Sequence, residues 1–219
     1  DKPLVQQYFI WIGNLLHGDF GRSFVLNRPV LDEVLERFQA TLILAGVALV
    51  LCSIFGLFAG IVSAVRQFGW ADRTITFIVL AGISIPSFWL GLLLIYLFAV
   101  HWRILPASGM YAVYGGGDLK DLIWHLILPA STLAVVAAGV IARLTRGAML
   151  EVLRQDYIRT ARAKGLNEHR VIYGHAFRAA LVSVIPVIGI QAGFVLGGAV
   201  YIETVFQWPG IGAMLVKAI

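Results

Sequence analysis

Charged residues are scarce in this sequence. Only 13% of its 219 residues are Asp, Glu, Lys or Arg, whereas 59% are hydrophobic, and the mean hydropathy is +0.85. A soluble domain of this length needs many more charges to cover its surface. The composition therefore excludes an ordinary soluble protein and predicts that lipid surrounds most of the chain.

Four stretches contain no charged residue, and they are 28, 29, 21 and 24 residues long. A helix rises about 1.5 Å per residue, so about 20 apolar residues cross a hydrocarbon core of about 30 Å. The first stretch lacks the alternation of apolar and polar residues that barrel strands need. We therefore predict an all-α membrane protein, a polytopic helix bundle with spans at about 40–65, 75–101, 122–143 and 180–202.

Residues that carry catalysis or bind cofactors are also scarce. Cys52 is the only cysteine, and the run from Gly115 to Gly117 lacks the Lys-Ser/Thr ending of a phosphate-binding loop. The histidines lack metal-ligand spacing, and no paired nucleophile and carboxylate lies in a span. We predict no enzymatic activity and no cofactor or metal in this chain. An ion-coupled secondary transporter stays the alternative function, although its spans would be expected to contain charged residues.

Basic residues are distributed unequally between the two sides of the predicted bundle. If the spans alternate in direction, the loops 66–73 and 143–178 share one side and hold ten of the 17 basic residues. The other seven are spread over more residues. Cytoplasmic loops are enriched in Lys and Arg, so we place these two loops in the cytoplasm and residues 1–39 and 203–219 on the outer side.

Polar residues, prolines and glycines inside the spans have more than one interpretation. Ser84, Ser87 and Gln191 are candidate pathway residues, and each fits equally well as a hydrogen-bonding contact between helices. The prolines allow kinks, and ordinary bundle packing explains them as well as a hinge does. Glu203 is predicted to lie in water at the outer end of the fourth span. The prolines within the spans are Pro86, Pro129 and Pro186. The glycines at helix-packing spacing are Gly56, Gly60, Gly189, Gly193 and Gly197.

The loop at 143–178 carries a net charge of +5, from eight basic and three acidic residues. Its middle predicts a short helix with Tyr157, Thr160, Ala161 and Lys164 on one face. Gly165 supplies the residue that ends this helix, and Asn167 can cap a second helix that returns to the membrane. Such a protrusion could be gripped by another protein, or the loop could bind anionic lipid headgroups.

The loop sequence DYIRTARAKG at 156–165 resembles the cytoplasmic loop of permease subunits of binding-protein-dependent ABC importers, in the dipeptide, oligopeptide and nickel group. The EAA–Gly signature of that family aligns with Arg159-Thr160-Ala161 and Gly165, and Arg159 replaces its Glu. The resemblance covers essentially the whole chain. Further motifs that agree lie at 18–23 (GDFGRS), 83–89 (ISIPSFW), 125–130 (HLILPA) and 203–212 (ETVFQWPGIG).

The resemblance implies a permease subunit of a bacterial or archaeal cytoplasmic membrane, with one span before Asp1 and a last span after Ile219, both missing here. It implies four kinds of partner: a second permease subunit, two ATPase subunits that bind ATP and Mg²⁺, an extracytoplasmic substrate-binding protein and the lipid membrane, with no nucleic acid. Peptides are the expected substrates. The residues implied to contact an ATPase within the coupling loop 144–179 are Tyr157, Arg159, Thr160, Ala161, Ala163, Lys164 and Gly165.

Overall fold

The computed structural model describes residues 3–23 and 27–218, and nearly all of its ordered elements are helices. Within these residues the one β feature is an isolated bridge between Arg22 and Pro29. Lys2, which the sequence analysis counted among the outer basic residues, lies outside the described part. The elements in chain order are α1 (Leu4–Leu16), α2 (Val30–Val65), α3 (Trp70–Ser84), α4 (Ser87–Leu94), the π-helix η1 (Ile95–His101), α5 (Leu119–Leu153), α6 (Asp156–Ala163), the π-helix η2 (Arg170–Ala176), α7 (Phe177–Val205) and α8 (Ile211–Ala218).

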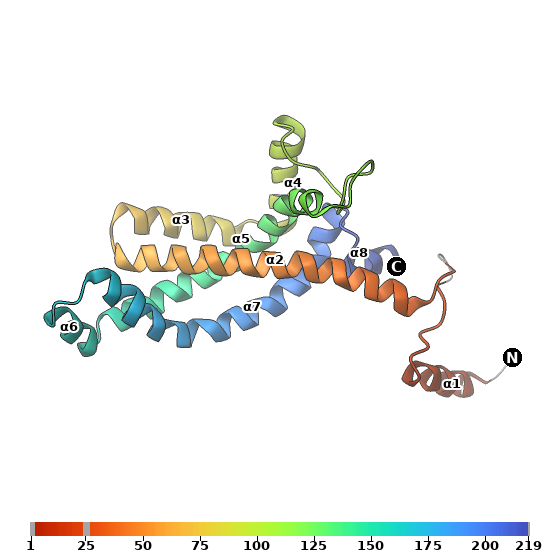
Figure 1. Cartoon of the computed structure of the whole chain (residues 1–219). Coiled ribbons are helices and arrows are strands. Elements are labelled where there is room, and N and C mark those ends of the chain that lie inside the picture. The colour runs from red at the N-terminus through yellow and green to blue at the C-terminus, as the bar shows by residue number, and fades with distance from the viewer. Residues whose placement is uncertain (1–2, 24–26, 219) are drawn as a thin grey trace.

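In the described part of the chain, three helices are long and apolar enough to cross a membrane, and they run along the long axis of the molecule (Figure 1). They are α2, α5, and η2 continued by α7, with 36, 35 and 36 residues. In its most apolar window α5 is 67% buried, against 28% for α2 and 22% for the η2–α7 helix, so α5 is the centre of the bundle. Each of the three contains one of the predicted spans and extends beyond it.

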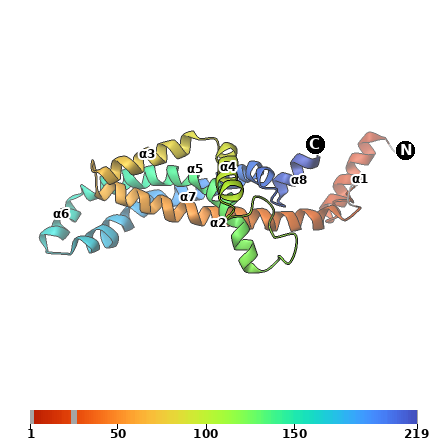
Figure 2. The ribbon, with the colours of Figure 1, turned by 90° about the horizontal axis from the view of Figure 1, so that it is seen from above.

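The remaining predicted span, 75–101, is not one straight helix. It is divided at Ile85 and Pro86 into α3 and the α4–η1 pair, which are bent by 105° relative to each other. Pro86 has no backbone N–H and cannot continue the hydrogen-bond ladder of α3, so a new helix starts after it. Figure 1 shows this segment leaving the bundle axis, and Figure 2 views it nearly end-on.

Close packing of α2 on α5 depends on two glycines. A Cβ atom at Gly56 would lie 2.8 Å from the Ile141 side chain, and one at Gly60 would lie 2.5 Å from Cβ of Thr145. The absence of a side chain lets the two backbones approach, which is how helices associate in lipid. Gly189, Gly193 and Gly197 of α7 show no such contact, because a Cβ atom at each meets nothing within 4 Å in the described chain.

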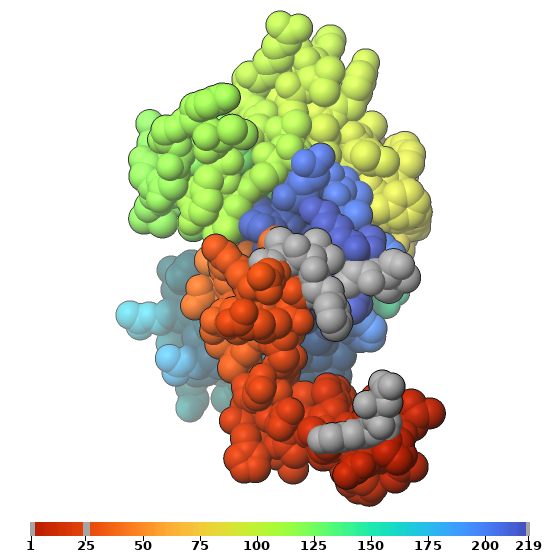
Figure 3. Space-filling view, turned by 90° about the vertical axis from the view of Figure 1, so that its right-hand side faces the viewer, coloured from red at the N-terminus to blue at the C-terminus, as the bar shows by residue number. Residues whose placement is uncertain are grey.

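Different segments of the chain lie at the two ends of the molecule. The turn between α2 and α3 lies at the same end as α6, while both termini and the 102–118 loop lie at the other (Figure 1). Figure 3 views that second end, where the blue C-terminal segment lies between the green segments and the orange start of α2. The chain thus brings together, at one end, the two loops that the sequence analysis assigned to one side of the membrane.

Candidate functional site

The protrusion at the α6 end is a helix, a turn and a second helix. Helix α6 ends at Ala163, and Gly165 follows with φ of +77°, in the left-handed region that glycine adopts at low cost. Asn167 Oδ1 then accepts a hydrogen bond of 2.9 Å from the His169 backbone N–H, at the start of the helix that returns as η2 and α7. The local structure follows the pattern expected from the sequence.

Helix α6 has an inner and an outer face. Ile158 and Ala161 are buried in a cluster that includes Met149 and Val171. Ala161 therefore contacts the bundle and does not share the outer face with Thr160, because it lies one turn beyond Ile158. The remaining candidate coupling residues are exposed, namely Tyr157, Arg159, Thr160, Ala163, Lys164 and Gly165.

An ion pair closes the turn after α6. Arg162 Nη2 lies 2.7 Å from Glu168 Oε1, and Arg162 Nε donates to Oε2 over 3.2 Å. The hydrogen bond from Arg162 lowers the pKa of the Glu168 carboxyl below its ordinary value. Arg159 lies 3.5 Å from Asp156 in a fully hydrated position. Arg162 is thus occupied within the loop, and Arg159 and Lys164 are the exposed cations among the candidate coupling residues.

A cavity of about 310 Å³ lies between α4, α5 and α7, and it brings together two of the three candidate pathway residues. Ser87 lines it from the start of α4 and Gln191 from α7, and apolar side chains such as Leu133, Val136 and Phe194 form most of the rest of the wall. Ser84 does not belong to this site. Its side chain is exposed and donates to the Leu80 carbonyl of its own helix over 2.8 Å.

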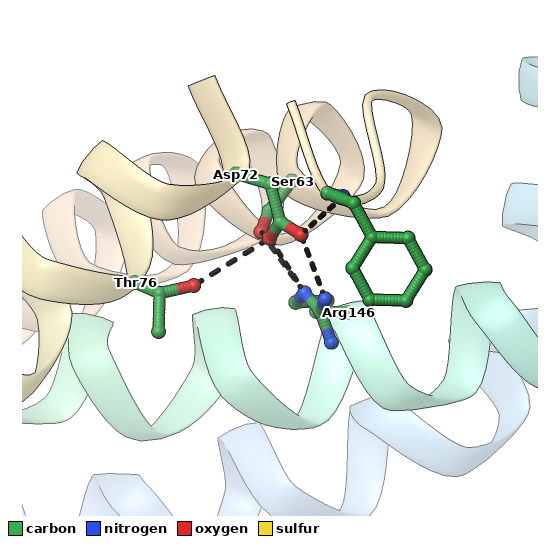
Figure 4. A network of polar contacts seen from close by, with 5 residues as sticks. Ser63, Asp72, Thr76 and Arg146 are labelled. Carbon is green, nitrogen blue, oxygen red and sulfur yellow. Dashed lines mark hydrogen bonds and ion pairs between the residues drawn. The ribbon is translucent and has the colours of Figure 1, made fainter. Parts of the chain in front are cut away.

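A charged network that the sequence analysis did not predict joins α2, α3 and α5 near the α6 end (Figure 4). Arg146 of α5 donates two hydrogen bonds of 2.8 Å to the carboxylate of Asp72 in α3. Ser63 of α2 also donates to Asp72, and the Phe68 backbone N–H donates to it over 2.9 Å. In the sequence, Asp72 and Arg146 are simply loop charges 74 residues apart, and no local signal pairs them.

Glu203 was predicted to be in water, and that prediction is wrong: its side chain is fully buried. Helices α2 and α8 both cover it: the carboxylate accepts hydrogen bonds of 2.6 Å from the Thr41 hydroxyl of α2 and 3.1 Å from the Ala213 backbone N–H of α8. A Cβ atom at Gly210 would lie 2.1 Å from this carboxylate, so only glycine fits there. The motif at 203–212 therefore packs the ends of α2, α7 and α8 together.

A bundle of long apolar helices with an exposed basic helix–turn–helix at one end is the architecture of a polytopic membrane protein, and comparison with known proteins names the family. Residues 56–219 match the family described as the inner membrane component of binding-protein-dependent transport systems. The chain belongs to this family. It is a multi-pass protein of the inner membrane.

Similar proteins are found among peptide permeases. The chain is 45% identical to the di/tripeptide transport system permease protein DppB of Pseudomonas aeruginosa, with all of the chain and 70% of the relative covered. It is 42% identical to the dipeptide permease protein DppB of Escherichia coli, over 71% of that protein. It is 44% identical to the glutathione permease protein GsiC of Escherichia coli, over 68% of that protein.

A solved structure shows the same fold. The chain superposes on a chain of the methionine ABC transporter MetNI, solved in inward-facing conformations, with a TM-score of 0.67 and 21% identity. The match covers 84% of this chain and 79% of the other. The fold is therefore that of an ABC importer permease.

Proposed function

We propose that this chain forms half of the transmembrane pathway of an ATP-driven importer for peptides and receives force from a partner ATPase through residues 156–170. The permease relatives named for di/tripeptides, dipeptides and glutathione support the substrate class, since all three kinds of substrate contain peptide bonds. In this proposal ATP and Mg²⁺ bind to two ATPase subunits, and a second permease and an extracytoplasmic binding protein complete the complex.

The observation that carries the proposal is the construction of α6. Its outer face presents Tyr157, Thr160 and Lys164 to a partner, while Ile158 on its inner face is fully buried against the bundle. A partner that displaces the outer face therefore displaces α5 and η2, which flank α6 in the chain and pack in the same cluster. A coupling element has to be fixed to the moving helices in this way. Otherwise binding of the partner cannot shift the equilibrium between two conformations of the bundle.

Site-directed cross-linking tests the contact. Thr160→Cys in the complete complex is expected to cross-link to an ATPase subunit, and ATP is expected to change the yield. Val113→Cys provides the control: it is 90% exposed in the 102–118 loop at the opposite end and should give no ATPase product. Cross-linking of both cysteines to the same ATPase, or of neither, would overturn the proposed contact.

Transport by the complete complex, reconstituted in vesicles, tests which energy source drives uptake. Uptake of a dipeptide into vesicles should require ATP and a loaded binding protein, and should persist when ionophores remove all ion gradients. Uptake that stops with the ionophores and continues without ATP would favour the ion-coupled alternative. Co-purification of ATPase subunits with the tagged permease is a second, independent expectation.

A further inference from the structure

One polar side chain in the cavity between α4, α5 and α7 lacks a partner. Gln191 is 8% exposed, and its amide forms no hydrogen bond within the described residues. It is the fifteenth of the 29 residues of α7, so it lies at the middle of that helix. The amide atoms of Gln191 are not enclosed by protein but open on the cavity, so water or a solute there can supply the hydrogen bonds that the described residues do not.

A second set of hydrogen-bond donors begins at Ser87, which lines the same cavity. Helix α4 restarts after Pro86, and the N–H groups of its first turn have no intrahelical acceptor. No side chain caps this end in the structure. Ser87, the first residue of α4, lines the cavity and adds a hydroxyl group that has no hydrogen bond among the described residues. The start of a helix also carries a partial positive charge, which favours an anion.

The remaining wall restricts the kind of ligand. Among the described lining residues none is charged, and most are aliphatic or aromatic. A carboxylate in such a place needs several donors, because its loss of water is otherwise too costly. The Gln191 amide, the Ser87 hydroxyl and the first turn of α4 together provide them, and the apolar wall accepts side chains without selecting among them.

We infer that this cavity is a subsite for the terminal carboxylate of a passing peptide, held by Gln191, Ser87 and the start of α4. The inference rests on the proposed transport of peptides and adds where and by which group they are held. It also gives the 105° bend a role, since only a broken helix presents its N-terminal N–H groups inside the membrane.

The test measures the initial rate of dipeptide uptake by the complete reconstituted complex. Gln191→Leu removes the donor and should slow uptake about tenfold, the effect of losing one hydrogen bond to a charged group. Gln191→Glu keeps the size and polarity but brings negative charge and should slow uptake further. If Gln191 only hydrates the bundle, Glu should work as well as Gln and better than Leu, and that order would overturn the inference.

A serine pair provides a second measurement with a built-in control. Ser87→Ala should slow uptake several-fold, whereas Ser84→Ala, whose hydroxyl is bonded to Leu80 outside the cavity, should leave it unchanged. Equal rates for the two variants would overturn the inference even if the Gln191 variants fail to assemble. Failure of the wild-type complex to take up any peptide would instead refute the proposed function, so the two failures are distinguishable.

Discussion

Arg146 binds Asp72 through two parallel hydrogen bonds, from Nε to Oδ1 and from Nη2 to Oδ2, each 2.8 Å long. The paired geometry is the strongest that an arginine and a carboxylate form. It fastens the turn between α2 and α3 to α5 seven residues before α5 ends, and α6 begins three residues after that end. The pair is therefore placed where a displacement of α6 would first reach α3.

Asp72→Asn should lower the stability of the bundle. Asp72 is buried, while the Arg146 side chain is 29% exposed and regains some water, so we expect a loss of about 1–3 kcal/mol. Thermal unfolding of the purified protein measures it. Glu36→Gln, at an exposed acidic residue beyond the first turn of α2, is the control and should be neutral.

A double-mutant cycle shows whether the loss belongs to the pair. Asp72→Asn combined with Arg146→Gln should be less destabilising than the sum of the two single changes, by about 0.5–3 kcal/mol. Strict additivity would mean that the two side chains act independently, in contradiction to the geometry.

Gly60→Ala should loosen the contact between α2 and α5. The added Cβ atom would lie 2.7 Å from the Ala142 carbonyl oxygen, so a backbone has to move, at a cost of about 1–3 kcal/mol. Gly46→Ala in the same helix meets nothing within 4 Å and should be neutral or slightly stabilising. Folded yield and thermal unfolding in detergent compare the two, and equal effects would show that the packing is not what sets stability.

Gly165→Val should uncouple ATP hydrolysis from transport and leave membrane insertion intact. Space is not the cause, since a Cβ atom at Gly165 meets nothing within 4 Å. The cause is the left-handed backbone at φ of +77°, which costs a β-branched residue about 1–2 kcal/mol. Gly165→Asn tolerates this conformation and should retain most activity. Normal substrate-stimulated ATP hydrolysis in the valine variant would contradict the prediction.

Acid should release the turn after α6. The pKa of Glu168 is lowered by Arg162, so the stabilisation is present above the ordinary glutamate value of 4.5 and is lost as pH falls through the lower folded value. Both groups are about half exposed, so the effect is small, about 0.2–1 kcal/mol. A spin label at Ala163→Cys should become more mobile over that pH range.

The control for this experiment removes the carboxylate. With Glu168→Gln the label should be mobile already at neutral pH and should respond little to acid. A label that loosens equally in both proteins would show that another group titrates.

The spans could be predicted because the cost of placing charge in lipid acts on each segment separately. The stretch 38–65 contains no charged residue, and this signal does not depend on which helices it packs against. Helix α2 contains the whole stretch. The turn at Gly165 was predictable for a similar reason, since backbone conformation at a helix end depends on the residues there. Pro86 indicated an interruption, but the 105° bend depends on how α4 packs on α5 and α7, which no local pattern contains.

Contacts between distant segments could not be predicted. Asp72 finds Arg146 only when the α2–α3 hairpin lies against α5, and Glu203 becomes buried only because α2 and α8 cover it. Ala161 was assigned to the outer face of α6 because helical spacing groups it with Thr160. Which of the two is covered depends on how α6 packs against the bundle, and Ala161 is the buried one. The missing partner of Gln191 also becomes visible only in three dimensions.

The attachment of the C-terminal segment to the start of α2 has a consequence for biosynthesis. Trp208 donates from Nε1 to the Ala40 carbonyl over 2.8 Å, across 168 residues, and Glu203 reaches Thr41 across 162. At roughly 5–20 residues per second, the start of α2 waits about 8–30 s in the membrane before these partners are made. The contacts around Thr41 therefore form only after α7 and α8 have been made. Until then, an assembly factor or the translocation machinery has access to the segment around Thr41.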